Sequence, residues 1–249
     1  YAQFAVNAVW LHSHGKRYPY IRSVYRSARI ALPLLKKIAV KGMPLLFNEA
    51  LWSASVAVLN QCYSTRGLTV VAANNIASTL WNLFSVCFIS LGSATGIIIG
   101  QMLGAGKPAD EVRDCDRKLI AFSVTSCAVF GIAMAAVSGV FPLIYKTDNS
   151  VRSLATAFIC INAVIMPFNA YANAAYFTLR SGGKTLSTLL FDSCFVWVAY
   201  TLSRFTGIAI LPLYAVCQSA EILKCVIGYI MLRRGSWIKN IVQTHPDAE

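Results

Sequence analysis

Charged residues are scarce in this chain, and acidic residues are the scarcest. Asp, Glu, Lys and Arg together make up 13% of the 249 residues, whereas hydrophobic residues make up 57%. A typical soluble domain is about one-quarter charged, so this composition excludes an ordinary water-soluble domain. We therefore expect a membrane protein.

Groups that commonly serve catalysis or metal binding are also few. The three histidines, His12, His14 and His245, lie outside the long apolar runs, and no two of the eight cysteines are spaced C-x-x-C. Most of these cysteines lie inside apolar runs, where Cys behaves as a small hydrophobic residue. A zinc site, a disulfide framework and a Ser-His or His-Asp pair are therefore not expected. We predict neither an enzyme nor a resident cofactor.

Long apolar runs are what the sequence has in abundance. A helix needs roughly 20 mostly apolar residues to cross the hydrocarbon layer. Six runs approach or exceed that length, namely residues 44–63, 76–103, 119–145, 154–179, 186–202 and 212–232. They are continuous and contain Leu, Ala and Met, which favours helices over the alternating strands of a barrel. The predicted fold is an all-α membrane protein with a bundle of six transmembrane helices.

The basic residues lie mainly in every second connection between these runs. Of the 22 Lys and Arg residues, only Arg66, Lys146, Arg152 and Arg204 lie in the opposite connections, and Lys224 lies inside a run. Basic connections stay on the cytoplasmic side of a membrane, so we predict a multi-pass protein of the cell membrane with a cytoplasmic C-terminus. We accordingly expect the net charge of +12 to favour contact with membrane lipid and not with a nucleic acid.

The chain divides by composition into four parts. We interpret residues 1–11 as the tail of a preceding transmembrane helix and residues 12–43 as a basic cytoplasmic linker. Residues 44–232 form the predicted six-helix lobe, and residues 233–249 a cytoplasmic C-terminal tail. Within the linker, residues 32–40 fit a short interfacial helix, which would either sense anionic lipids or only connect two bundles. We favour the connecting role.

Glycines are spaced for helix packing in the second run. Gly92, Gly96, Gly100 and Gly104 are four residues apart, which places them on one helix face. Such a ridge of small residues lets two membrane helices approach closely. The G-x-G-x-x-A match that ends at Ala109 follows no strand, so it does not indicate a dinucleotide site.

Three acids lie in the apolar runs, and Glu49 is the most informative of them. A charge in the hydrocarbon costs about 3 kcal/mol or more, so such an acid usually faces a cavity or a partner. At about 100° per residue, Glu49, Ser53 and Asn60 fall within about 40° of one another on a helix. Glu49 would therefore bind a cation or a proton, or else be a protonated, hydrogen-bonded structural residue. We favour ion coupling.

The other two acids have simpler alternatives. Glu221 and Lys224 are three residues apart, close enough for an ion pair on one helix face, which is a structural role as readily as a functional one. Asp192 either pairs with Lys184 or Arg180 at the cytoplasmic edge or reaches into the bundle as a second ion-coupling residue.

The fourth run carries a polar stripe. Asn162, Asn169, Asn173, Tyr176 and Arg180 are separated by 7, 4, 3 and 4 residues, which places them within about 60° of one helix face. Such a stripe lines a wet cavity or holds helices together. We favour a substrate cavity that also includes Asn60, because Pro167 interrupts the same helix and allows it to bend.

Several segments, in this order, resemble a known family of transporters. They are "KGMPLLFNEALWS", "AANNIASTLWNLF", "GSATGIIIGQMLGAGKPAD", "LRSGGKT" and "AEILKCVIGYIMLRRGSWIKN". Together they resemble the C-terminal lobe of the multidrug and toxic compound extrusion (MATE) family, from about residue 33 to the end. The resemblance implies a twelve-helix antiporter of two six-helix lobes, of which this chain supplies one lobe and the linker.

The resemblance also implies roles for individual residues. Glu49 matches the position of a glutamate that the family uses for cation coupling, so it would hold Na⁺ in a sodium-coupled protein. Asn169 falls near a position that is aspartate in a sodium-coupled bacterial branch, which leaves the choice between Na⁺ and H⁺ open. The implied partners are membrane lipid, small organic cations and the missing N-terminal lobe.

Two other functions remain open from the sequence. A lipid-linked oligosaccharide flippase of the same superfamily would share the lobe but would need more Arg and Lys in the cavity, where only Lys224 lies well inside a run. A purely structural membrane subunit would bury Glu49 and the Asn stripe in a dry bundle. We rank both below an antiporter that exports organic cations or drugs in exchange for Na⁺ or H⁺.

Overall fold

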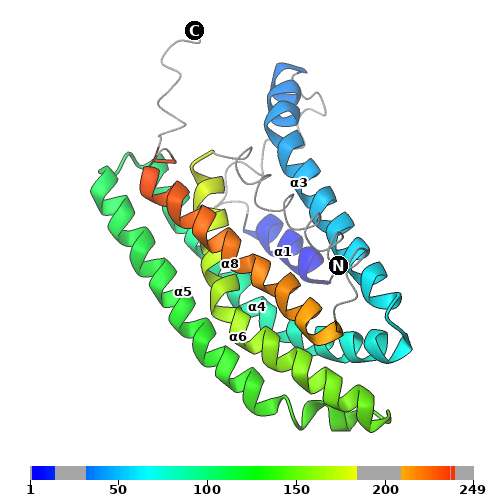
Figure 1. The fold of residues 1–249 in the computed structure, drawn as a ribbon. Helices are drawn as coiled ribbons and strands as arrows, with labels where there is room; N and C mark the ends of the chain where they lie inside the picture. Colours follow the sequence, from blue (N-terminus) through cyan, green and yellow to red (C-terminus); the bar gives the residue numbers. More distant parts are fainter. Residues whose placement is uncertain (1, 15–31, 184–208, 236, 239–249) are drawn as a thin grey trace. The chain divides into compact units, whose positions relative to one another are not determined.

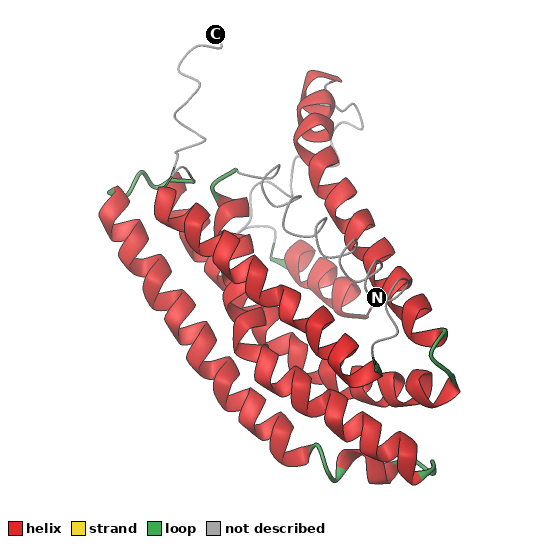
Figure 2. Cartoon of the chain, viewed as in Figure 1, coloured by secondary structure: helices red, strands yellow, loops and turns green. Residues whose placement is uncertain are grey.

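The computed structural model describes residues 2–14, 32–183, 209–235 and 237–238, and within these ranges every regular element is a helix (Figures 1 and 2). The elements are α1 (Ala2–Ser13), α3 (Leu32–Ser64), α4 (Leu68–Gly104), α5 (Ala109–Val137), the short 3-10 helix η1 (Phe141–Ile144), α6 (Asn149–Ser181) and α8 (Ile210–Arg234). The predicted all-α fold class is confirmed.

The chain forms two compact units that divide between Met43 and Pro44. The first, Tyr1–Met43, contains α1, in which the side chains of His12 and Ser13 bond back to carbonyl groups of the preceding turn. The second, Pro44–Glu249, contains the larger part of α3 and the remaining helices. The sites described below all lie in the second unit.

Four described helices are long and apolar enough to cross a membrane, namely α4, α5, α6 and α8. They correspond to the predicted runs at residues 76–103, 119–145, 154–179 and 212–232. The run at residues 44–63 lies within α3, which is not among these four. The run at residues 186–202 lies outside the described residues.

The third run is shorter as a helix than its apolar length suggests. We expected it to continue to Tyr145, but α5 ends at Val137 and the chain turns through η1. Pro142 lies in the first turn of η1 and has no N–H to donate to the carbonyl of Ser138, and its ring would collide with that carbonyl in a continuing α-helix. The proline therefore prevents a regular α-helix from continuing to Tyr145, although α5 itself already ends before it, at Val137.

Helix α6 is the centre of the bundle, with extensive interfaces to α4, α5 and α8. Its contact with α4 uses part of the predicted glycine ridge. A Cβ at Gly92 or Gly96 would lie 3.0 Å from the Phe177 side chain, and one at Gly100 would lie 3.7 Å from Ser181. Two of the four glycines therefore permit a close approach of α4 to α6, as the spacing predicts.

The contact of α5 with α6 depends on Pro167, which lies inside the continuous helix α6. Because proline has no N–H, the carbonyl of Ala163 loses its usual helical partner four residues later. A Cβ at Gly131 of α5 would lie 2.7 Å from this carbonyl oxygen. Gly131 thus lets the backbone of α5 pack directly against the proline-interrupted turn of α6.

The C-terminal end of α8 is closed by a tryptophan that we expected to lie in a tail. Trp237 is 1% exposed, and its indole N–H donates a hydrogen bond of 3.1 Å to the carbonyl of Leu232. Its side chain packs with Ile99 and Leu103 of α4, Val112 of α5 and Leu179 of α6. Gly235, with φ of 66°, turns the chain back toward these helices, because glycine adopts this left-handed conformation without strain.

Candidate functional site

The part of α3 after Met43 presents two different faces. Asn48, Ser55 and Cys62 are buried and spaced seven residues apart, so they face the bundle. Glu49, Ser53 and Asn60 are exposed, and these three residues form what we call the Glu49 face. The sequence predicted that they share one face of a helix, and the structure places them so, on the side that the rest of the lobe leaves uncovered.

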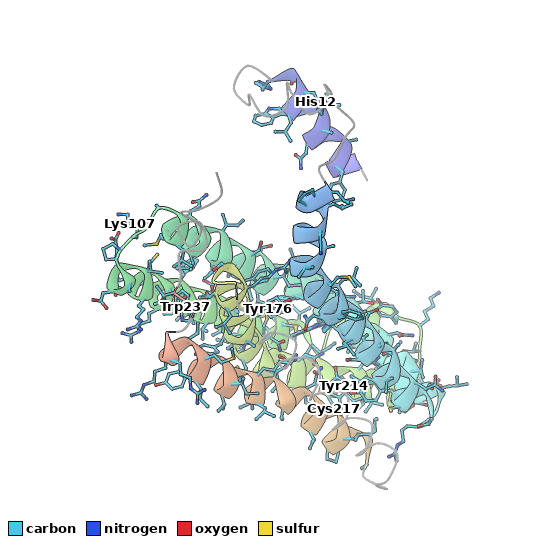
Figure 3. The ribbon with its side chains drawn as sticks, turned by 90° about the horizontal axis from the view of Figure 1, so that it is seen from above. His12, Lys107, Tyr176, Tyr214, Cys217 and Trp237 are labelled. Atoms are coloured by element: carbon cyan, nitrogen blue, oxygen red, sulfur yellow. The ribbon has the colours of Figure 1, made fainter. Side chains whose placement is uncertain are left out.

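Asn48, directly before the candidate acid, connects α3 to α6. Its side chain is 2% exposed, and its Nδ2 donates a hydrogen bond of 3.2 Å to the Tyr176 hydroxyl. Tyr176 was predicted as a cavity residue from the polar stripe of α6, and Asn48 was not singled out. Tyr176 is labelled in Figure 3, where it lies on α6 near α3.

Asn60 lies at the other end of the Glu49 face. Its Oδ1 accepts a hydrogen bond of 3.2 Å from Nδ2 of Asn74 in α4. Both side chains lie close to the short connection between α3 and α4, about three helical turns from Glu49. Asn60 is therefore exposed on the same face as Glu49 but is held by a neighbouring helix, and its predicted role in a substrate cavity stays a prediction.

The predicted polar stripe of α6 does not form one exposed face. Asn162 is 3% exposed, and its Oδ1 accepts hydrogen bonds from the Tyr214 hydroxyl at 3.0 Å and from Gln218 Nε2 at 2.7 Å. We call these three residues the Asn162 cluster. Phe158 of α6 stacks on the Tyr214 ring with centroids 4.0 Å apart. At this level α8 covers the stripe, so Asn162 joins α6 to α8, and its predicted role in a substrate cavity stays a prediction.

Further along the stripe the asparagines bond within their own helix. Asn169 is 9% exposed, and its Nδ2 donates to the carbonyl of Ile165 at 3.4 Å. Asn173 is half-buried and its Nδ2 donates to the carbonyl of Asn169 at 3.3 Å. Arg180 is exposed at the end of the helix. One helix face is thus contacted by α8 at Asn162, by α4 near Asn173 and by α3 at Tyr176.

Glu221 and Lys224 of α8 form the predicted ion pair. Lys224 Nζ lies 2.8 Å from Glu221 Oε1, and both side chains are about 15% exposed. Side chains three or four residues apart meet on one face of a helix, so this contact follows directly from the sequence. Asp192, the other predicted ion-coupling residue, lies outside the described residues.

A buried acid that the sequence reasoning missed lies in α5. Asp116 is 3% exposed, and its Oδ1 accepts a hydrogen bond of 2.7 Å from the hydroxyl of Thr178 in α6. In the sequence it stands among basic residues just before the apolar run, where an exposed acid is the ordinary expectation. Its spacing of four from Val112 and Ile120, which are also buried, was the available signal.

The described residues contain no group of three or more His, Cys, Asp and Glu side chains that could hold a metal ion. Glu49 is the acid on the exposed face of α3, and Ser53, one turn later on that face, offers a hydroxyl oxygen beside its carboxylate. Asn60 lies about three turns away, too far to bind the same ion. Oxygen ligands of this kind suit a hard cation such as Na⁺, and a carboxylate alone suffices for a proton.

Comparison with known proteins decides the family. The family model MatE matches residues 44–205, which is more than half of the chain. The chain belongs to the MatE family. The resemblance inferred from the sequence motifs is therefore confirmed, and the match begins at the residue where the second compact unit begins.

Curated relatives of this MatE chain are multidrug resistance proteins by name. Multidrug resistance protein MdtK of Edwardsiella ictaluri is 29% identical over 160 residues, which are 62% of this chain and 34% of that protein. Probable multidrug resistance protein NorM of Mannheimia succiniciproducens is 25% identical over 176 residues, or 68% of this chain and 37% of that protein. The chain thus spans about a third of the length of these relatives.

A solved structure supports the fold of the MatE lobe. A MOP superfamily transporter from Pyrococcus furiosus superposes with a TM-score of 0.73 at 13% sequence identity, covering 86% of this chain and 49% of that one. At this identity the likeness shows the fold alone.

Proposed function

We propose that this chain is part of a secondary active antiporter of the cell membrane that exports organic cations or drugs in exchange for Na⁺ or H⁺. The observation that carries the proposal is the exposed carboxylate of Glu49 in a helix of an otherwise apolar MatE lobe. The proposal places this part of α3 within the membrane, where an exposed acid is costly in lipid and therefore indicates a wet cavity or a cation. The names of the relatives MdtK and NorM support drugs as the exported class.

The mechanism follows from competition at Glu49. A cationic drug and the coupling ion cannot both neutralise one carboxylate, so entry of Na⁺ or H⁺ favours release of the drug. Rocking of this lobe against its partner would expose the site alternately to the two sides of the membrane. A cytoplasmic C-terminus is part of the proposal, because the basic residues Arg113, Arg180, Arg233 and Arg234 lie at the ends of α5, α6 and α8 that meet around Trp237.

The ion pair in α8 argues against a flippase. A lipid-linked pyrophosphate requires cationic side chains that are available in the cavity, and Lys224 is already neutralised by Glu221 at 2.8 Å. In contrast, the Glu49 face carries a negative charge and suits a cation. We therefore retain the antiporter as the proposed function.

The test uses the full-length protein reconstituted in vesicles. We expect Glu49→Gln to abolish efflux of a fluorescent organic cation driven by a Na⁺ or a H⁺ gradient, because the amide carries no charge for the ion to neutralise. The two gradients are imposed separately, so that the wild type identifies the coupling ion. Glu111→Gln is the matched control, since Glu111 is an exposed acid at the start of α5 that pairs with Lys107 at 3.0 Å. Gradient-dependent efflux that survives in Glu49→Gln would reject the proposal.

A further inference from the structure

The residue before Glu49 lies about 100° around α3 from it and contacts the bundle. Asn48 is 2% exposed and donates a hydrogen bond of 3.2 Å to the Tyr176 hydroxyl. An amide buried among apolar helices costs free energy unless it is hydrogen-bonded. Asn48 therefore gives this turn of α3 a defined position relative to α6. Because Glu49 is the next residue, that position also sets where its carboxylate lies.

Tyr176 begins a run of three residues in α6 that three different helices contact. Tyr176 accepts the bond from Asn48 of α3, Phe177 packs against Gly92 and Gly96 of α4, and Thr178 donates to Asp116 of α5 at 2.7 Å. The rings of Tyr176 and Phe177 meet edge to face with centroids 5.5 Å apart. We call residues 176–178 the junction, because α3, α4 and α5 each contact α6 within these three residues.

A proline on the N-terminal side of the junction allows α6 to bend there. Pro167 lies about two and a half turns earlier in α6 and weakens the helix there, so the segment that carries the junction can change its angle. At its other end α3 contacts α4 through Asn60 and Asn74, and α8 through the rings of Tyr63 and Tyr214, whose centroids are 5.6 Å apart. The turn that carries Glu49 is thus linked to the junction by Asn48.

We propose that Asn48 is a positioning residue for ion coupling, and that its hydrogen bond to Tyr176 transmits the occupancy of Glu49 to the junction. The proposal rests on the proposed function, in which Glu49 binds the coupling ion. Binding removes a charge one residue from Asn48 and changes which position of this turn of α3 is most stable. The bond then moves Tyr176 with α3, and Phe177 and Thr178 carry the change to α4 and α5.

The test compares Asn48→Ala, Tyr176→Phe and the double variant in the full-length protein reconstituted in vesicles. The readout is the concentration of Na⁺ or H⁺ that gives half-maximal ion-driven efflux of ethidium. Loss of one neutral hydrogen bond is worth about 1 kcal/mol, so we expect each single variant to raise this concentration about fivefold. The double variant should resemble the singles, because both remove the same bond.

Tyr214→Phe is the matched control, because it also removes a buried tyrosine hydroxyl that bonds to an asparagine of α6. We expect it to lower thermal stability and to leave the ion dependence unchanged. The inference is overturned if Asn48→Ala and Tyr176→Phe keep the wild-type ion dependence while Glu49→Gln loses coupling, and the proposed function then stands. It is equally overturned if Tyr214→Phe shifts the ion dependence as much as Tyr176→Phe does. Intact coupling in Glu49→Gln would instead reject the proposed function itself.

Discussion

At the scale of single residues, buried polar side chains join the helices of this lobe in specific pairs. Asp116 accepts from Thr178, and Asn162 accepts from Tyr214 and Gln218. The lipid around a membrane helix offers no hydrogen bonds, so a buried polar group must find its partner within the protein. These pairs therefore specify which helices lie side by side. Apolar side chains specify this only weakly, because they contact lipid tails about as favourably as they contact another helix.

The Asp116–Thr178 pair gives a prediction at this scale. Thr178→Val keeps the shape of the side chain but removes the hydroxyl that donates to Asp116, so the buried carboxyl group loses this partner. We expect a loss of about 1–3 kcal/mol in stability, measured as a lower thermal unfolding temperature in detergent. Thr125→Val is the control, because the exposed Thr125 hydroxyl bonds only to carbonyls of its own helix among the contacts described. An equal loss in both variants would contradict the assigned role of the pair.

At the scale of elements, the close contact of α5 and α6 results from a proline and a glycine on different helices. Pro167 removes a donor from the Ala163 carbonyl, and Gly131 leaves room for the backbone of α5 beside that oxygen. About four turns further along α6, Gly92 and Gly96 make the same kind of room for Phe177 of the junction. Small residues thus fix the distance from α6 to both neighbours.

Gly131→Ala tests this packing. The added Cβ would lie 2.7 Å from the Ala163 oxygen, and because that oxygen is backbone, the helices must move apart. We expect a cost of about 1–3 kcal/mol and reduced transport by the full-length protein, because the shift reaches the Pro167 turn. Gly100→Ala serves as the control, since its Cβ would make an ordinary contact of 3.7 Å with Ser181. Alanine is the better helix former, so that variant should be as stable as the wild type or more so.

At the scale of the whole molecule, residues after α8 complete the bundle. Trp237 contacts α4, α5 and α6 at the end where α8 finishes, and a Cβ at Gly182 would collide with its backbone. Figure 3 shows Trp237 at the end of α8 opposite to Tyr214 and Cys217. Trp237 thus closes this end of the described helices through contacts within the chain itself.

Trp237→Ala tests the closure. Removal of a fully buried tryptophan costs about 3–5 kcal/mol in soluble cores, and we expect a marked fall in the unfolding temperature of the full-length protein in detergent. Trp52→Ala should have a much smaller effect on that temperature, because Trp52 is 53% exposed. Equal effects of the two substitutions would show that Trp237 does not hold the four helix ends together.

The sequence by itself determined the properties that depend on one helix at a time. Apolar length predicted the helices, the spacing of Glu49, Ser53 and Asn60 predicted their common face, and the three-residue spacing of Glu221 and Lys224 predicted their contact. Each of these follows from helical periodicity alone. The same periodicity cannot say where a helix ends within an apolar run, and α5 ends at Val137, before the η1 turn that contains Pro142.

The tertiary structure decided which neighbour covers each part of a face. Asn162 and Tyr176 share one face of α6, yet α8 buries the first and α3 contacts the second, because the neighbouring helices cross α6 at different heights. For the same reason Asp116, Asn48 and Trp237 gained partners far away in the sequence, and no spacing within their own segments indicated those partners. Periodicity fixes the direction of a side chain, whereas helix crossing fixes what it meets.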